Sequence, residues 1–382
     1  MLPQADNQAV LREDVSPRQR GLGIALVALL GGLAAALTSL GNPGNMGLCG
    51  ACFLRDWAGA LGLHGGPAIF RPEVTGIALG ALVWSVVARR HIGRSGSFAA
   101  TRFMLGVVMS CGALVFLGCP FRMLQRLGGG DLNAWAALPG FVGGVAIATF
   151  FERRGYSLGK TQPVPFPVGL VGVGALCALL GVFLVGGVLA GPGPGSTAAP
   201  AHAVWWQALG IALIAGGALS ATGFCAVSAA RQVFGPRRSM LVAAAVFVAA
   251  YAVVVGVAGR FEFALEGQPV SHGDWLWSSL AMALVGLSGA LAGGCPVRQI
   301  VMAGEGNGDA FVAVGGMVLG GALAHSLGLA SAPATAELLG GPTPAGRVSV
   351  VALLIAVVVY AAAMSRAQPR SATPRAGGAP LP

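Results

Sequence analysis

Two short stretches decide how this chain folds: Leu117-Gly-Cys-Pro-Phe-Arg122 and Gly293-Gly-Cys-Pro-Val-Arg298. They share the pattern Gly-Cys-Pro-x-Arg and lie 176 residues apart. Each follows an apolar run of the kind that enters a bilayer. A proline suits the first position of a new helix, because its missing N–H would have no partner there. Each stretch therefore predicts a short helix that starts within the membrane, with the cysteine at or near its N-cap.

The same offset relates further parts of the chain without a gap. It carries small, thiol and basic residues of the first half onto identical residues of the second, namely Gly47, Cys49, Arg55, Gly140 and Gly144 onto Gly223, Cys225, Arg231, Gly316 and Gly320. The sequence therefore predicts an internal repeat.

The composition indicates an integral membrane protein. Of the 382 residues, 55% are hydrophobic and 9% are charged, whereas a soluble domain carries about 25% charged residues. The 62 glycines suit membrane helices, whose backbones approach closely at small residues.

Ten apolar runs predict an all-α protein with two five-span halves. An odd number of spans places the second half upside down, which is the inverted-repeat pattern of transporters. We expect a cytoplasmic tail at 1–20, a first repeat at 21–190, a linker at 191–204, a second repeat at 205–365 and a disordered tail at 366–382. The runs lie near 21–40, 73–88, 101–117, 132–151, 166–190, 205–220, 239–258, 275–293, 309–328 and 348–365.

The basic residues predict the orientation. With both termini in the cytoplasm, 16 of the 23 basic residues fall on cytoplasmic segments, as the positive-inside rule requires. This rule explains the net charge of +10 better than nucleic-acid binding does. We expect a multi-pass protein of the inner (plasma) membrane, with the lipid bilayer as its surroundings.

Four cysteines form the candidate site. Cys49 and Cys225 lie in the segments Met46–Leu63 and Thr222–Phe234, which are too short to cross and return, so we expect re-entrant half-helices there. With Cys119 and Cys295 they make four half-helices along one pathway. A half-helix N-terminus favours an anion or a thiolate.

The neighbours of these thiols complete the predicted pathway. Arg122 and Arg298 either raise the local potential for an anion or anchor the half-helices at the interface. We also include Gly118, Gly294, Pro120 and Pro296 from the two motifs.

Other polar and thiol residues have simpler interpretations. Cys52, Cys111 and Cys177 are expected to fill apolar space, and the histidines show no metal-ligand spacing. No metal, cofactor or catalytic residue is predicted. Four residues are expected to cap the following spans, namely Asp131, Asn133, Asn307 and Asp309.

The paired Gly-Cys-Pro-x-Arg segments, together with Asn42-Pro-Gly-Asn-Met-Gly-Leu-Cys-Gly-Ala-Cys-Phe-Leu-Arg-Asp56, resemble the YeeE/YedE family of sulfur-compound transporters. The long Asn42–Asp56 motif and Cys119-Pro-Phe-Arg…Gly-Gly-Asp-Leu-Asn133 are most similar to its selenium-metabolism subgroup. The resemblance covers about residues 20–365. It implies uptake of thiosulfate or a selenium compound, which is handed between thiols by S–H hydrogen bonds at Cys49, Cys119 and Cys295. Cys225 is the fourth symmetric position.

The expected function is import of a small sulfur- or selenium-containing anion, not enzymatic catalysis. A soluble sulfur or selenium carrier on the cytoplasmic side would be a separate protein. The alternative is a soft-metal transporter that uses Cys-Pro sites for copper. A thiol oxidoreductase based on Cys49 and Cys52, or a non-transporting scaffold, are further alternatives.

Overall fold

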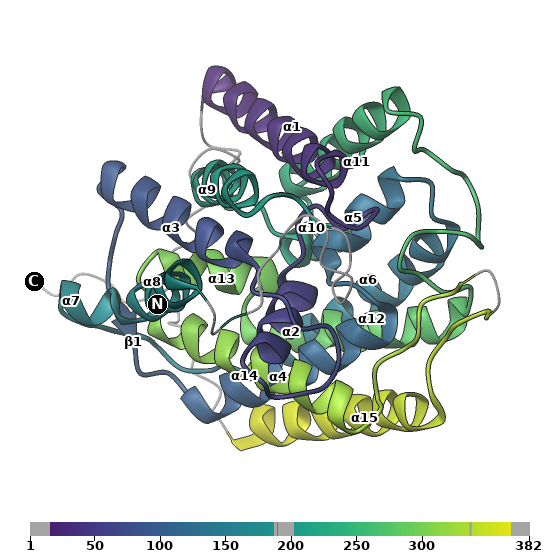
Figure 1. Cartoon of the computed structure of the whole chain (residues 1–382). Helices are drawn as coiled ribbons and strands as arrows, with labels where there is room; N and C mark the ends of the chain where they lie inside the picture. Colours follow the sequence, from purple (N-terminus) through teal and green to yellow (C-terminus); the bar gives the residue numbers. More distant parts are fainter. Residues whose placement is uncertain (1–15, 187–188, 190–201, 336–337, 368–382) are drawn as a thin grey trace, which may run out of the picture.

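The computed structural model describes residues 16–186, 189, 202–335 and 338–367, and this part of the chain is mostly helical (Figure 1). Ten helices correspond one by one to the ten apolar runs. They are α1 (Pro17–Ser39), α3 (Pro72–Val87), α4 (Ala99–Phe116), α6 (Leu132–Arg153), α8 (Val171–Val185), α9 (Trp205–Thr222), α11 (Ser239–Val257), α12 (Trp275–Ala292), α14 (Gly308–Ser326) and α15 (Pro344–Ala367).

Five shorter helices and two strands complete the described chain. The short helices are α2 (Gly50–Ala60), α5 (Pro120–Gly128), α7 (Phe166–Gly169), α10 (Ala226–Gln232) and α13 (Pro296–Gly304). The two-residue strands β1 (Arg94–Ser95) and β2 (Gln162–Pro163) pair antiparallel, with Arg94 opposite Pro163.

The helices confirm a multi-pass membrane protein. Within the described residues, eight helical segments are long and apolar enough to cross a bilayer, and α3 and α8 are apolar helices of 16 and 15 residues. Three of the eight segments contain a long helix followed by a short one: α4 with α5, α9 with α10, and α12 with α13. Large apolar side chains remain exposed on the outermost helix α15, including Val348, Ile355 and Val359. Lipid would cover such a surface.

The boundaries of four helices recur at the spacing found in the sequence. The first residues of α2, α4, α5 and α6 lie 176 positions before those of α10, α12, α13 and α14. The packing relates these helices in the same way, because α4 contacts α14 and its counterpart α12 contacts α6. In addition, α1 contacts α11, and α3 contacts α9.

Glycines allow the long helices to pack backbone against backbone. A Cβ built on Gly140 of α6 would lie 2.0 Å from the carbonyl oxygen of Ser279 in α12. A Cβ on Gly316 of α14 would lie 2.1 Å from that of Phe103 in α4. Any side chain at these positions would separate the helices.

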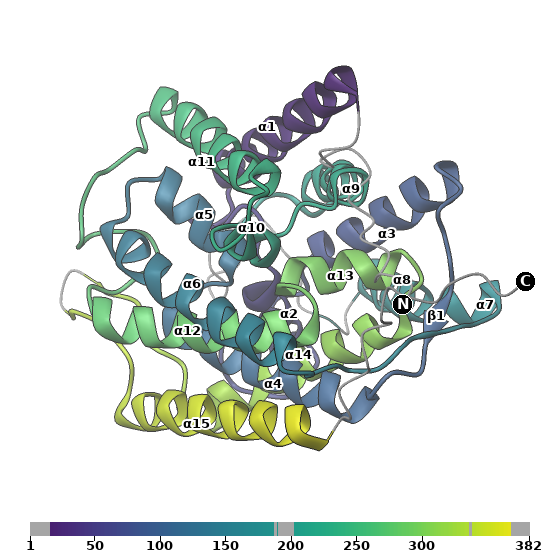
Figure 2. The same ribbon diagram turned by 180° about the vertical axis from the view of Figure 1, so that it is seen from behind.

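The short helices α2, α5, α10 and α13 lie in the middle of the bundle, and both views show long helices around them (Figures 1 and 2). Their centre contains aromatic rings, since the centroid of Phe121 is 4.8 Å from that of Phe247 and 6.0 Å from that of Phe224. The bundle therefore buries the four segments that carry the candidate thiols.

The expected segment limits differ slightly from the helices. α1 begins at Pro17, inside the expected tail 1–20, because Ser16 forms a capping box with Gln19. α15 continues to Ala367, and the rest of the expected tail 366–382 lies outside the described residues. The expected linker at 191–204 likewise falls outside them, except for residues 202–204.

Candidate functional site: four thiols at helix N-termini

Each of the four candidate cysteines is the N-cap residue of a short helix, which confirms the N-caps predicted at Cys119 and Cys295 and adds those at Cys49 and Cys225. Cys49 caps α2, Cys119 caps α5, Cys225 caps α10 and Cys295 caps α13, all with extended backbone. The Cys49 sulfur accepts a hydrogen bond from the backbone N–H of Cys52 at 3.4 Å. Each thiol therefore lies where the first amides of a helix have no backbone acceptor.

The Gly-Cys-Pro-x-Arg motif has a local explanation in α5 and α13. Pro120 and Pro296 occupy the first turn, where a missing N–H costs nothing. Left-handed residues end the preceding helices, Leu117 with φ 60° after α4 and Gly293 with φ 91° after α12. The chain thus changes direction just before each cysteine.

The motif glycines make room for the motif arginines. A Cβ on Gly118 would lie 3.0 Å from Cδ of Arg122, and a Cβ on Gly294 would lie 2.9 Å from Cγ of Arg298. Each arginine stem therefore folds back over the glycine that precedes the cysteine.

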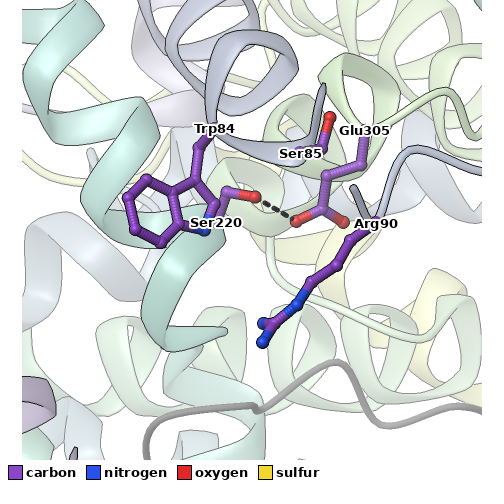
Figure 3. A pocket seen from close by; sticks show the side chains of 5 residues that line it. All are labelled: Trp84, Ser85, Arg90, Ser220 and Glu305. Atoms are coloured by element: carbon purple, nitrogen blue, oxygen red, sulfur yellow. Dashed lines mark hydrogen bonds between the residues drawn. The ribbon is translucent and has the colours of Figure 1, made fainter. Parts of the chain in front are cut away.

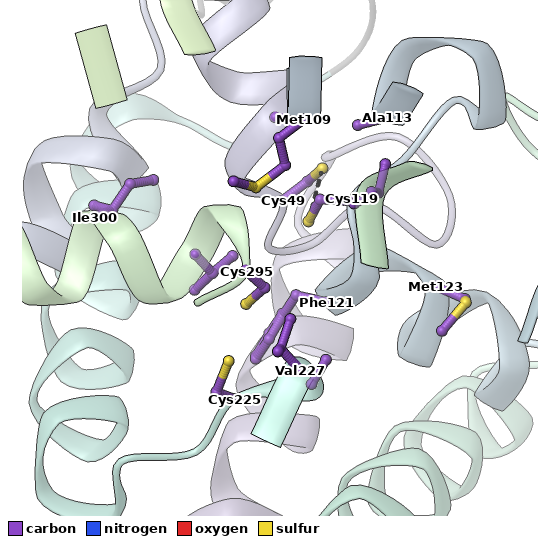
Figure 4. Packing of buried hydrophobic residues seen from close by; sticks show 14 of the residues in the cluster. Cys49, Met109, Ala113, Cys119, Phe121, Met123, Cys225, Val227, Cys295 and Ile300 are labelled. Atoms are coloured by element: carbon purple, nitrogen blue, oxygen red, sulfur yellow. Dashed lines mark hydrogen bonds between the residues drawn. The ribbon is translucent and has the colours of Figure 1, made fainter. Parts of the chain in front are cut away.

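The four thiols form two pairs (Figure 4). The sulfurs of Cys49 and Cys119 are 3.5 Å apart, and Cys225 and Cys295 lie next to each other in the same view. All four residues are at most 2% exposed.

The N-termini that carry the two pairs approach each other. A Cβ on Gly50, the first residue of α2, would lie 2.7 Å from the Pro296 side chain at the start of α13. The backbone amides of Gly50 and Arg122 also lie close enough to the Cys119 sulfur to interact with it. Converging N-termini give this centre a positive partial charge without a buried lysine.

Arg122 is held entirely by backbone carbonyl oxygens. Nε donates to Asn45 at 3.0 Å, Nη1 donates to Leu117, and Nη2 donates to Pro269 and Val270 at 3.2 Å each. Its side chain is completely buried. Arg122 ties α5 to the loop before α2 and to the loop between α11 and α12.

Arg298 has a different partner, the carboxylate of Glu305. Its Nη1 and Nη2 atoms lie 3.2 and 3.3 Å from the two Glu305 oxygens. Glu305 follows α13 as its C-cap residue and accepts a further hydrogen bond from Ser220 at 2.8 Å. The two repeat-related arginines therefore lie in unlike surroundings.

Buried ion pairs support the short helices, and the sequence reasoning missed them. Arg126 in α5 pairs with Asp131 at 2.6 Å, and Arg71 pairs with Asp56 at 2.7 Å. Arg55 also contacts Asp56. The available signal was charge of opposite sign within apolar sequence, which requires a partner when it is buried.

Of the four expected caps, two are confirmed and two are wrong. Asp131 caps α6 and Asn307 caps α14 through their side chains. Asn133 instead donates to the carbonyl oxygen of His272 and to Ser278, while Asp309 accepts from the backbone amides of Gly96 and Ser97. These partners lie far away in the sequence, in two loops and in α12, so local spacing gave no sign of them.

Of the other cysteines, Cys52 is buried beside Cys49, while Cys111 and Cys177 lie in the long helices α4 and α8. Cys111 in α4 is directed at the carbonyl oxygen of Gly320 at 3.7 Å, and Cys177 in α8 is half-buried. Cys52 follows Cys49 in the first turn of α2. Within the described ranges, no three His, Cys, Asp or Glu side chains are grouped to hold a metal ion.

The fold and site together define a multi-pass helical membrane protein whose centre gathers four buried thiols at helix N-termini. No protein-family model matches the chain, and no curated protein matches it either.

Proposed function

We propose that this protein is a membrane transporter that imports a small sulfur- or selenium-containing anion through a central pathway lined by Cys49, Cys119, Cys225 and Cys295. The observation that carries the proposal is the placement of all four thiols at helix N-termini within the buried centre, with the Cys49 and Cys119 sulfurs 3.5 Å apart.

The proposed architecture is an inverted repeat in which α2, α5, α10 and α13 are re-entrant half-helices. It is supported by the recurrence of helix boundaries at 176 residues and by the exchanged packing of α4 with α14 and α6 with α12. Backbone that interrupts helices at bilayer depth is tolerated where it is buried in protein or lines a cavity. Binding sites of such transporters lie where the two repeats meet.

The chemistry of the centre favours a soft anion. Helix N-termini attract negative charge, and thiol groups are weak hydrogen-bond donors. A large, polarisable sulfur or selenium anion loses less hydration than sulfate on entering such a centre. Thiosulfate, which the resemblance to the YeeE/YedE family implies, fits this description, and so does a selenium analogue.

The proposed orientation places both termini in the cytoplasm of a cell with an inner (plasma) membrane. Basic residues support it, because the segments 89–102, 153–160 and 231–238 then face the cytoplasm. A soluble carrier that accepts the cargo would bind at that side.

A soft-metal transporter is the second candidate. Met109 belongs to the same buried cluster as the thiols and lies in the same close view (Figure 4). Thiols and a thioether together suit Cu(I).

Uptake assays distinguish these candidates. The chain is expressed in a strain that lacks its own sulfur-anion and copper transporters, and uptake of thiosulfate, selenite, selenide, sulfate and Cu(I) is compared. We expect uptake of thiosulfate or a selenium species and little uptake of sulfate. Uptake of Cu(I) alone would establish the second candidate, and uptake of none of these would refute both.

A further inference from the structure

A small pocket lies at the far end of α13 from Cys295. It is lined by Trp84, Ser85, Arg90, Ser220 and Glu305 (Figure 3). These residues come from the end of α3 and the loop after it, from α9 and from the C-cap of α13. In the proposed orientation, the pocket lies at the cytoplasmic end of the pathway.

Glu305 lines the buried side of the pocket. Its carboxylate is 4% exposed and holds both Nη atoms of Arg298, which is itself 12% exposed at the side chain. Ser220 donates to the same carboxylate at 2.8 Å, as Figure 3 shows. The positive charge nearest the start of α13 is therefore neutralised by a tethered anion.

The other half of the chain shows that this carboxylate is not needed to fix the arginine. The residue 176 positions before Glu305 is Gly129, and Arg122 is ordered without any carboxylate, by carbonyl oxygens alone. A Cβ on Gly129 would meet the Asn45 side chain at 2.3 Å. In the first half, the loop that contains Asn45 therefore occupies the space that corresponds to Glu305 and its pocket in the second half.

Arg90 is the cation that lines the pocket, while Arg298 is held behind Glu305. Arg90 is exposed, and no ion pair with another residue of the described ranges holds it. Its guanidinium group points away from Glu305 in Figure 3. His91, the next residue, packs against Gly306. Burial lowers the pKa of His91, while Glu305 opposes this shift.

We propose that this pocket is a second binding site for the transported anion, where Arg298 and Arg90 bind the anion once it displaces the Glu305 carboxylate from Arg298. The inference rests on the proposed transport function and extends it to the release step. Glu305 acts there as a tethered competitor. It weakens binding so that cargo leaves toward the cytoplasm.

Equilibrium binding to the purified full chain tests this site. Thiosulfate and selenite are titrated separately against the unchanged protein and against Glu305→Gln. Removing the competing charge should tighten binding of at least one anion by about fivefold or more, the lower end of typical coupling between sites. The double variant Arg298→Gln/Glu305→Gln should lose this gain, because the cation that binds the anion is then absent.

A matched control separates the local effect from a general change in charge. Glu152 pairs with Arg231 at 2.6 Å outside the pocket, so Glu152→Gln changes the net charge equally and breaks an equivalent pair. Its binding should equal that of the unchanged protein. Equal tightening in Glu152→Gln, or no tightening in Glu305→Gln with either anion, would overturn the proposal.

A surface variant covers the case in which Glu305→Gln does not fold. Arg90 is exposed, so Arg90→Gln should fold and weaken anion binding a few-fold; unchanged binding would remove Arg90 from the site and overturn the proposal. A failure of this binding proposal can be told apart from a failure of the proposed transport function. Uptake that survives loss of the thiols would refute the thiol pathway, whereas the binding change in Glu305→Gln concerns the pocket alone.

Discussion

The sulfur of Cys49 lies 3.5 Å from the sulfur of Cys119, although 70 positions separate the two residues. Each is the N-cap of a different short helix, so two helix starts point their free amides at neighbouring thiols. In the other half, Cys225 and Cys295 are likewise the N-caps of two short helices, α10 and α13, and they lie next to each other in Figure 4. The pairs place the most polarisable groups of the centre where its partial charge is positive.

The packing of α6 on α12 gives the first prediction. Gly144→Ala should destabilise the protein by about 1–3 kcal/mol, as overpacking does, because its Cβ would lie 2.0 Å from the Ala283 carbonyl oxygen. Thermal unfolding in detergent measures the effect. Gly143→Ala in the same helix is the control, since a Cβ there has no neighbour within 4 Å. Equal behaviour of the two variants would argue against the close approach of these helices.

Arg122 gives a second prediction, which decides between its two expected roles. Lysine cannot satisfy the same set of carbonyl oxygens, so Arg122→Lys should lower the stability by roughly 1–3 kcal/mol, the cost of leaving buried polar groups unpaired. The exposed pair Arg347–Asp274 supplies the control Arg347→Lys, which should change little. Weakened anion binding with unchanged unfolding would instead assign Arg122 to the cargo.

The ion pair between Arg126 and Asp131 gives a third prediction. Asparagine caps helices as well as aspartate does, so Asp131→Asn keeps the cap of α6 while it removes the charge and the acceptor for Arg126 Nε. Both side chains are fully buried, and an uncompensated buried charge costs about 3–5 kcal/mol. Unfolding measurements should show a loss of this size, whereas Asp274→Asn at the surface should show almost none. Comparable small losses in both variants would mean that Arg126 does not depend on Asp131.

The sequence predicted the helices and the position of the thiols because both depend on local signals. Apolar runs set the ten long helices, and a proline directly after each of Cys119 and Cys295 set the start of α5 and α13. Cys49 and Cys225 have no following proline; there the shortness of the segments Met46–Leu63 and Thr222–Phe234 predicted short helices.

What the sequence did not predict depends on contacts between distant segments. Asp309 looked like a helix cap, yet it binds the loop at Gly96 and Ser97, more than 200 positions away. Likewise, the carbonyl oxygens of Asn45, Pro269 and Val270 that hold Arg122 belong to loops far from it in the sequence. Side-chain partners of this kind follow from the packing of the two halves.

The thiol pathway is tested most directly by uptake of radiolabelled thiosulfate into proteoliposomes that contain Cys295→Ser. Serine is a preferred N-cap, so this variant keeps the start of α13 and removes only the sulfur. The control is Cys111→Ser, which changes a buried thiol away from any helix start. We predict that Cys295→Ser reduces uptake more than about tenfold, equivalent to about 1.4 kcal/mol in the barrier, while Cys111→Ser transports normally. Uptake by Cys295→Ser at the rate of the unchanged protein would rule out a pathway that depends on its thiols.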